Sequence, residues 1–222
     1  MSELPEGLVA VGGPLTPDRL LVEYRRGVFP WYMPGQPVLW WSPEPRAVFD
    51  GCRVRVSRSL RRRLRRGEFR FTLDAAFDDV ISGCAQPRAA GEGTWITAEM
   101  SAAYRALHRR GYAHSLEVWL DSELVGGVYG VALGRVFFGE SMFSRAADAS
   151  KAALAVLAAY LRRERFTMID AQLPNAHLAR LGASEWSRAA FLARLAVDAE
   201  APDPIGRWML PARLSDGASA VE

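Results

Sequence analysis

The chain is organised around the segment Arg135-Val136-Phe137-Phe138-Gly139-Glu140-Ser141-Met142-Phe143-Ser144. Its apolar residues lead directly into one carboxylate, Glu140, and this pattern predicts a strand that is buried on both faces. A buried carboxylate is costly unless it is paired, hydrogen-bonded or used in chemistry. A helical pattern over residues 149–163 follows, so Glu140 is predicted to lie at a strand-to-helix junction, where α/β folds usually place their chemistry.

A second short strand is predicted at residues 167–172, directly after that helix. It ends in Asp170 and Gln172, which are two residues apart and therefore lie on the same face of the strand. We expect both side chains to meet Glu140 at one edge of a sheet. Upstream, residues 115–120, 124–133 and 136–139 predict an antiparallel meander. Glycines 126, 127 and 130 within one of its strands indicate a bulge or a close backbone approach to a ligand.

Length and composition limit the class of protein. The 222 residues suffice for one large domain, or for one domain with a small one added. The N-terminus lacks the basic and apolar regions of a signal peptide, and the longest apolar run, 152–161, is about half the length needed to cross a bilayer. Two cysteines, Cys52 and Cys84, provide neither a disulfide framework nor metal-ligand spacing. These features predict a cytoplasmic protein without a membrane segment or a structural metal.

The basic residues are unevenly distributed. Residues 53–70 hold nine arginines and one acid, Glu68, and residues 57–66 predict a short basic helix. Four of its arginines follow helical spacing on one face: Arg58, Arg61, Arg62 and Arg65. This face indicates a nucleic-acid or phosphate contact, although a solvated surface is the alternative. Lys151 is the only lysine among 28 basic residues, and it falls in the first turn of the helix after Glu140, where a phosphate could dock.

The first fifty residues differ in composition from the rest. A helix is predicted from Pro17, with Leu20, Leu21 and Tyr24 as its apolar stripe. The passage 29–46 holds three tryptophans and five prolines, which predicts a rigid aromatic loop without regular structure. We therefore divide the chain into a small N-terminal α/β domain at 1–49 and a larger domain at 50–222.

Several motifs are more specific than these patterns. They are Phe29-Pro30-Trp31, Leu39-Trp40-Trp41-Ser42-Pro43, Glu92-Gly93-Thr94-Trp95-Ile96-Thr97, His114-Ser115-Leu116-Glu117-Val118-Trp119, Leu124-Val125-Gly126-Gly127-Val128-Tyr129-Gly130, residues 139–144, Ala149-Ser150-Lys151 and Ile169-Asp170-Ala171-Gln172. In this order, over residues 8–195, the chain resembles the leucyl/phenylalanyl-tRNA–protein transferase family. The order of strands, helix, strand and helix is also compatible with the acyl-CoA N-acyltransferase fold, so the predicted class is α+β.

The resemblance implies a reaction and its partners. The family transfers leucine, phenylalanine or methionine from aminoacyl-tRNA to the N-terminal arginine or lysine of a protein, which marks that protein for degradation by the N-degron pathway. It also implies a small N-terminal domain joined to a domain of the N-acyltransferase fold (GNAT-like). Acetyltransferases of that fold have a glycine-rich pyrophosphate loop, whereas residues 144–149 contain no glycine. Coenzyme A is therefore not expected, no cofactor is predicted, and we expect a monomer.

The expected chemistry is direct attack of the protein's amine on the aminoacyl ester. The three histidines have no nucleophile motif nearby, and His114 is expected to be a structural hydrogen-bonder. Asp170 either accepts a hydrogen bond from the Gln172 amide or draws a proton from the amine. Gln172 holds the amine or the carbonyl, and Glu140 either supports the polar network or binds the cationic acceptor.

The donor side chain needs an apolar pocket. Candidate wall residues, for which core packing is the alternative role, are Val128, Met142, Leu154, Leu157 and Ile169; Phe143 and Ser144 are assigned to substrate binding with them. Trp31 and Trp95 match family positions near the tRNA 3′ end, where stacking on the terminal adenine is expected. The basic face and Lys151 are assigned to tRNA. The alternative functions are those of a CoA-dependent N-acetyltransferase and of a non-catalytic RNA-binding module.

Overall fold

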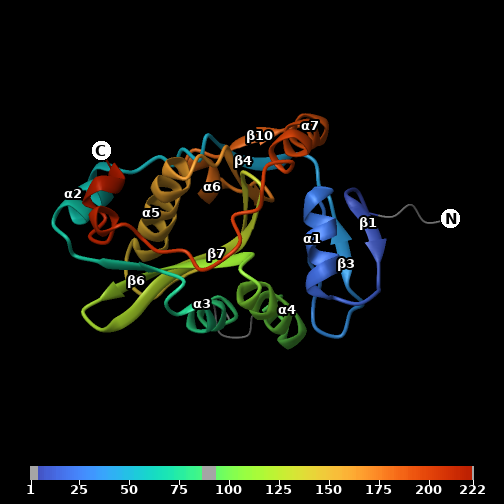
Figure 1. Cartoon of the computed structure of the whole chain (residues 1–222), viewed down its shortest axis with the longest axis horizontal. Helices are drawn as coiled ribbons and strands as arrows, with labels where there is room; N and C mark the ends of the chain where they lie inside the picture. Colours follow the sequence, from blue (N-terminus) through green and yellow to red (C-terminus); the bar gives the residue numbers. More distant parts are fainter. Residues whose placement is uncertain (1–4, 87–93, 222) are drawn as a thin grey trace.

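The computed structural model describes residues 5–86 and 94–221, and Figure 1 shows the two β-sheets of this part of the chain with their helices. The small sheet has the order β1-β3-β2, with bounds Leu8–Val11, Leu39–Trp41 and Phe29–Pro30; helix α1, Pro17–Arg25, belongs to the same part of the chain. The large sheet has the order β10-β4-β9-β8-β7-β6-β5, with bounds Ser184–Trp186, Arg46–Asp50, Met168–Gln172, Val136–Ser144, Glu123–Leu133, Ala113–Leu120 and Arg70–Leu73. The remaining helices are α2 Arg58–Arg65, α3 Phe77–Cys84, α4 Ala98–Arg109, α5 Ala149–Arg163, α6 Ala176–Arg180 and α7 Arg188–Asp198, with short 3₁₀ turns at Ala212–Leu214 and Ala218–Val221.

The large sheet is mixed. Its strand pairs are antiparallel except β8 with β9, which run parallel and are connected through α5. The meander β6-β7-β8, the helix and the parallel strand follow one another as the sequence predicted, and with the helices on both faces they confirm the α+β class with a mixed sheet. Strands β4 and β10 extend this sheet beyond β9, in antiparallel pairing that the sequence pattern did not indicate.

The aromatic passage is partly regular, so the prediction of an irregular loop was wrong. Strand β3 is the centre of the small sheet and pairs antiparallel with both β1 and β2. Trp40 is fully buried there. Proline lacks a backbone N–H, and accordingly Pro30 ends a two-residue strand at the edge of the sheet.

The division into residues 1–49 and 50–222 stays a prediction. Strand β4, Arg46–Asp50, pairs within the large sheet, so a division by sheets falls before Arg46. One hydrophobic core holds residues of both parts, among them Tyr24 and Trp40 from the small part and Tyr104 and Phe138 from the large one. The two parts therefore pack on each other through buried apolar surface.

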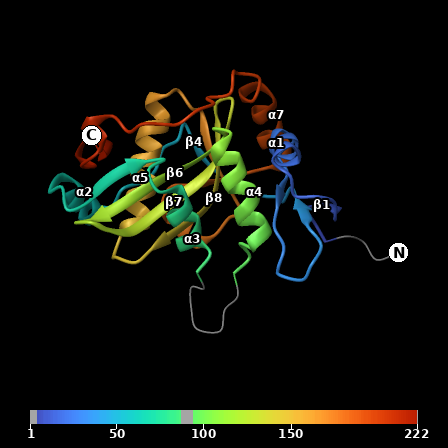
Figure 2. The ribbon, with the colours of Figure 1, turned by 60° about the horizontal axis from the view of Figure 1, so that its bottom comes forward.

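Helices cover both faces of the large sheet. Helix α5 lies against one face, and α3 and α4 lie against the other, as the two views in Figures 1 and 2 show. Each face has its own apolar core. Helix α5 is buried along most of its length through alanines and leucines, whose small and medium side chains let it lie close to the sheet. Within the described ranges, no helix combines the length and apolar character that crossing a bilayer requires.

The glycines of β7 are explained by contacts within the chain. A Cβ at Gly126 would stand 2.7 Å from the Cβ of Ala149 in α5, and one at Gly130 would stand 2.2 Å from the backbone oxygen of Phe138 in β8. The register shifts between Tyr129 and Gly130, which confirms the predicted bulge. The close approach is therefore that of a helix and a neighbouring strand.

We expect Gly126→Ala to destabilise the fold by about 1–3 kcal/mol, because the added methyl group overpacks the contact between β7 and α5. Gly139→Ala is the matched control on the neighbouring strand, since its Cβ would stand 3.5 Å from the nearest atom, which is ordinary contact. Urea unfolding gives both free energies of unfolding. Equal losses for the two variants would contradict the packing account of Gly126.

Candidate functional site

Glu140 occupies a bulge inside strand β8. Tyr129 of β7 pairs with Ser141 and Gly130 pairs with Gly139, so Glu140 is the extra residue between them. The strand continues to Ser144, and Glu140 therefore lies within it, not at its end as the sequence had indicated. Bulges re-aim side chains and often lie beside active sites. Here the bulge directs the Glu140 carboxyl group toward Tyr24, Tyr104 and Gln172.

The Glu140 carboxyl group contacts three donors from three other elements. Its Oε1 atom lies 2.6 Å from the hydroxyl of Tyr24 in α1 and 2.8 Å from Nε2 of Gln172 in β9. Its Oε2 atom lies 2.6 Å from the hydroxyl of Tyr104 in α4. The two hydroxyls are themselves 2.6 Å apart. Glu140 is thus held by the N-terminal helix, by a helix on the sheet face and by the neighbouring strand.

The protons in this cluster can be counted. The oxygens of Tyr24, Tyr104 and Glu140 make three short O···O contacts, and each contact needs one proton. The two phenols supply two protons, and a protonated Glu140 supplies the third. The neutral carboxyl group therefore satisfies the cluster completely, whereas the carboxylate leaves one pair of oxygens facing each other without a proton.

Burial also favours the neutral form of the Glu140 carboxyl group. It raises the pKa of Glu140 from its ordinary value of 4.5 to about 7, with the charge of Asp170 adding to the rise and the donors from Tyr104, Tyr24 and Gln172 opposing it. Burial also raises the pKa of Tyr24 and of Tyr104 well above the ordinary phenol value, and the charge of Glu140 raises both further. Glu140 is therefore the group of the cluster that changes its charge near neutral pH.

Asp170 is occupied by a buried ion pair. Arg46 of β4 donates from Nε to Oδ1 at 2.8 Å and from NH2 to Oδ2 at 2.7 Å, and both side chains are almost completely buried. The guanidinium lies between the rings of Phe29 and Phe191, with its central carbon 4.9 and 4.5 Å from their centres. This bidentate geometry is the strong form of the arginine–carboxylate pair. Asp170 is therefore fixed, and the closed pair leaves it no access to an incoming amine.

Gln172 connects the two carboxyl groups, in a different way from the one expected. Its backbone N–H donates to Asp170 Oδ1 at 2.9 Å, and its side-chain amide donates to Glu140, so the predicted bond from that amide to Asp170 is not formed. Gln172 has a φ of +63°, the left-handed region that is uncommon for residues other than glycine. Because Nε2 faces Glu140, the amide oxygen is the part of Gln172 left to accept a hydrogen bond from a substrate.

A cavity of about 370 Å³ opens beside Glu140. The parallel pairing of β8 with β9 ends at Phe138 and Asp170, and the cavity lies where the two strands part. Six of the predicted substrate-binding residues line it: Trp31, Trp95, Val128, Met142, Leu154 and Ile169. Leu157 is buried in the core and does not reach the cavity. Other lining residues escaped notice in the sequence, among them Phe29, Phe49 and Leu178.

Phe143 and Ser144 line a second cavity of about 680 Å³ instead. Met142, Asn175 and Leu178 belong to the walls of both cavities, so the two are neighbours. The backbone N–H of Ser150 donates to the hydroxyl of Ser144 at 3.2 Å, which fixes the end of β8 to the first turn of α5.

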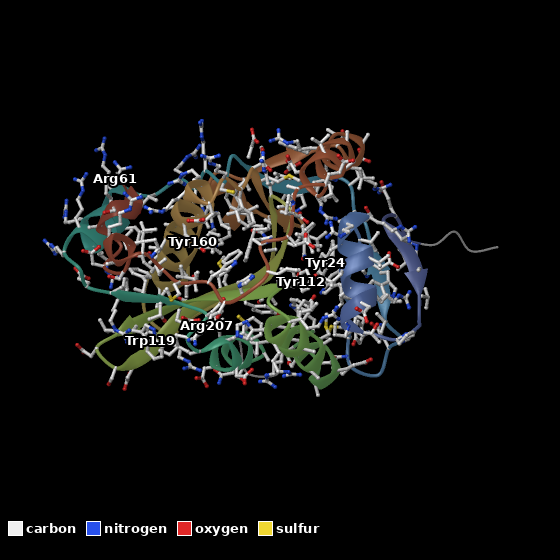
Figure 3. The ribbon with its side chains drawn as sticks, viewed as in Figure 1. Tyr24, Arg61, Tyr112, Trp119, Tyr160 and Arg207 are labelled. Carbon is white, nitrogen blue, oxygen red and sulfur yellow. The ribbon has the colours of Figure 1, made fainter. Side chains whose placement is uncertain are left out.

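The basic face of α2 forms as predicted. Arg58, Arg61, Arg62 and Arg65 are exposed, and within the described residues none of the four makes an ion pair. Figure 3 shows Arg61 pointing away from the protein at one end of its long axis, far from Tyr24. Lys151 instead pairs with Asp148 at 2.8 Å. The five tRNA-binding assignments stay predictions.

His114 has the structural role expected from the sequence. Its Nδ1 atom lies 2.8 Å from Asp74 Oδ2, and its ring stacks on that of Trp208 with centres 3.6 Å apart. Burial lowers the pKa of His114. Across residues 5–86 and 94–221, no three His, Cys, Asp or Glu side chains are grouped as a metal site would require.

Three residues of the site were missed in the sequence. Tyr24 was assigned to the apolar stripe of its helix, Tyr104 lies on the buried face of α4, and Arg46 was passed over as part of the aromatic passage. A tyrosine in a fully buried stripe needs a hydrogen-bond partner, and that requirement was the available signal. Arg46 gave no signal of this kind, because its partner is 124 residues away in the sequence.

Comparison with known proteins identifies close relatives. A family model described as "Leucyl/phenylalanyl-tRNA protein transferase" matches residues 48–196, and the model of its N-terminal domain matches residues 13–44. The leucyl/phenylalanyl-tRNA–protein transferase of Aromatoleum aromaticum is 58% identical over 93% of this chain and 87% of its own length. The one from Stutzerimonas stutzeri is 54% identical over 89% and 88%. Among solved structures, L-PGS from Bacillus licheniformis aligns with a TM-score of 0.41 at 14% identity, covering 80% of this chain and 56% of that one.

The raised pKa of Glu140 predicts a pH dependence of stability. The folded state binds this proton more tightly than the unfolded state, so the contribution is fully present below pH 4.5 and is lost as the pH rises through about 7. Glu140→Gln removes the titration while keeping the shape. We expect the wild type to lose on the order of 3 kcal/mol of its free energy of unfolding between pH 4.5 and 7.5 through this group, and the variant to lack this loss.

Urea unfolding at a series of pH values measures this difference. Glu123→Gln, at an exposed position, is the matched control and should keep the wild-type slope. Other groups titrate in the same range, and subtracting the two variant curves removes their contribution. A Glu140→Gln curve that runs parallel to the wild type would show that this carboxyl group does not titrate near neutral pH.

Proposed function

Because the chain belongs to the leucyl/phenylalanyl-tRNA–protein transferase family, we propose that it transfers leucine, phenylalanine or methionine from aminoacyl-tRNA to the N-terminal arginine or lysine of a protein. The product then enters the N-degron degradation pathway. We further propose that the protein acts in the cytoplasm as a monomer and without a cofactor. The whole proposal rests on this family membership together with one structural observation, the apolar cavity that meets Gln172 and Glu140 where β8 and β9 part.

The cavity suits the donor side chains. Its wall is apolar where Val128, Leu154 and Ile169 line it, and Met142 adds a flexible thioether that adapts to straight and branched side chains. A volume of about 370 Å³ accommodates one large aliphatic or aromatic side chain with the ester beside it. Trp31, with 40% of its surface exposed, offers a ring on which the terminal adenine of the tRNA stacks.

The reaction forms a C–N bond and breaks the ester C–O bond, and the proton lost by nitrogen ends on the ribose oxygen. An α-amino group has a pKa near 8, so roughly a fifth of it is neutral at physiological pH and can attack without a strong base. The Gln172 amide oxygen accepts a hydrogen bond from the attacking amine and aligns it with the ester carbonyl. Glu140 orients that amide through Nε2, and near pH 7 it can take or return a proton.

Asp170 has a positioning role in this scheme. It holds the Gln172 backbone in the left-handed conformation through the N–H contact, and Arg46 holds Asp170. Of the two roles considered for Asp170, the general base is not retained, because its carboxylate is already shared by Arg46 and the Gln172 backbone.

The competing functions lack equivalent support. A CoA-dependent acetyltransferase needs a glycine-rich loop for the pyrophosphate, whereas the segment before α5 is held by side-chain contacts of Ser144 and Asp148. An RNA-binding module without catalysis gives no reason to bury Glu140 among three polar groups.

Transfer of radiolabelled leucine from Leu-tRNA to a peptide beginning with arginine tests the function directly. We expect labelling of that peptide and of a lysine counterpart, and none of the same peptide after N-acetylation, because the α-amine is the nucleophile. Isoleucyl-tRNA should be a poor donor, since branching at Cβ widens the side chain where it enters the cavity. Labelling of the acetylated peptide would rule out attack by the α-amine.

The roles of Gln172, Asp170 and Glu140 are separable by pH profiles of kcat. Gln172→Ala should lower kcat by about 10²–10³-fold with a smaller change in KM, as expected for a group that acts mainly in the transition state. Asp170→Asn should lower kcat and keep the inflection, moved to lower pH, because it removes the negative charge that helps to raise the pKa of Glu140. Glu140→Gln should remove an inflection near pH 7. Loss of the inflection in Asp170→Asn, with the inflection retained in Glu140→Gln, would assign the proton transfer to Asp170.

A further inference from the structure

The second cavity lies beside the proposed reaction site, and the proposed reaction does not use it. Its volume is about 680 Å³, larger than that of the first cavity, and the two share Met142, Asn175 and Leu178 in their walls. The end of α3, the end of β8 and the beginning of α5 form its other walls. A ligand that fills the first cavity and continues along the wall formed by Met142 enters the second one.

Arg145 gives this cavity a positive charge that is held in place. Its guanidinium donates to the backbone oxygen of Leu124 at 3.2 Å and to Oε1 of Gln86 at 3.4 Å, and it lies over the ring of Phe143, 5.2 Å from the ring centre. All three partners are neutral. Within the described part of the chain, Arg145 makes no ion pair, and no described lining residue of this cavity is acidic. The charge is thus oriented but not compensated.

The ring of Phe143 packs closely against the backbone at two glycines, Gly83 and Gly127. A Cβ at Gly83 of α3 would stand 2.9 Å from that ring, and one at Gly127 of β7 would stand 3.2 Å from it. Phe143 therefore fills the space that two larger residues would occupy, and it provides a rigid support for Arg145. A preorganised cation loses little conformational freedom when it binds an anion.

The loop that follows Arg145 contacts the basic helix α2. Arg63 of α2 donates to the backbone oxygen of Ala147 at 2.6 Å, in the loop that connects Ser144 and Arg145 to α5. The loop that presents Arg145 to the second cavity is thus bonded to the helix that carries the basic face. A strand of RNA that ends in the first cavity passes Arg145 on its way to α2.

We propose that the second cavity binds the one or two nucleotides that precede the terminal adenosine of the donor tRNA, with Arg145 contacting their phosphate. The proposal rests on the proposed function, because it needs a tRNA donor in the first cavity. The charge of the cavity selects this ligand. The acceptor begins with a cationic residue, which Arg145 would repel, whereas a phosphodiester carries one negative charge per nucleotide.

Donors of increasing length test this assignment. The first is 3′-O-phenylalanyl adenosine without a 5′ phosphate, the second is a phenylalanylated CCA trinucleotide, and the third is Phe-tRNA. For Arg145→Ala we expect an unchanged KM for the adenosine donor and a KM about tenfold higher for the trinucleotide and the tRNA, the scale of one charge-assisted contact. The log–log slope of donor affinity against salt should fall by about one. Arg145→Lys should retain most of the affinity.

Two controls accompany this series. Arg109→Ala removes an exposed arginine at the end of α4 that lines neither cavity, and it should change no KM. Arg145→Glu keeps a polar exposed side chain and should exceed the effect of Arg145→Ala on the longer donors. Circular dichroism confirms that each variant is folded.

Three results would overturn the proposal. A KM that is unchanged for all donors would show that Arg145 does not contact the donor. An equal rise for the adenosine donor would place its effect in the first cavity, and a rise for the acceptor peptide alone would make the second cavity an acceptor site. Failure of the proposed function is distinguishable, because the wild-type protein would then transfer phenylalanine from none of the three donors.

Discussion

The geometry around the cavity depends on keeping the carboxyl group of Glu140 out of water. Burial of an isolated carboxylate is prohibitive, so the fold surrounds this group with two phenols and an amide. Each donor comes from a different element, and the position of Glu140 is therefore defined only when α1, α4 and β9 are all in place. The side chain of Gln172 is fixed in turn, because its amide nitrogen donates to Glu140. A fixed amide oxygen is what an attacking amine needs.

The buried ion pair between Arg46 and Asp170 also fixes the position of Gln172. Arg46 and Asp170 hold the backbone of Gln172, while Glu140 holds its side chain. Breaking a buried pair by removing one partner is strongly destabilising, since it leaves an uncompensated charge. The site is therefore built from two carboxyl groups with separate roles. One is locked by a guanidinium, and the other is poised near neutral pH among neutral donors.

The sequence predicted the main strands and the residues of the site better than it predicted their contacts. Glu140, Asp170 and Gln172 do meet, because the periodicity of two strands and the helix between them places them at one edge. The pairing within that group was wrong, since a bulge at Glu140 and a positive φ at Gln172 leave no trace in hydrophobic periodicity. The partners Tyr24, Tyr104 and Arg46 lie between 36 and 124 residues away along the chain. Only the folded sheet brings them together.

The shared core beneath the two sheets has a consequence for how the protein melts. Tyr24 and Trp40 of the small part lie in the same apolar cluster as Tyr104 and Phe138 of the large part, and the ring of Tyr24 lies 5.0 Å from that of Phe138. Detaching the small sheet would expose this surface and strip a donor from Glu140 at the same time. We therefore expect the two sheets to unfold as one cooperative unit, with no separate thermal transition for the small sheet and with loss of the cavity beside Glu140 in the same step.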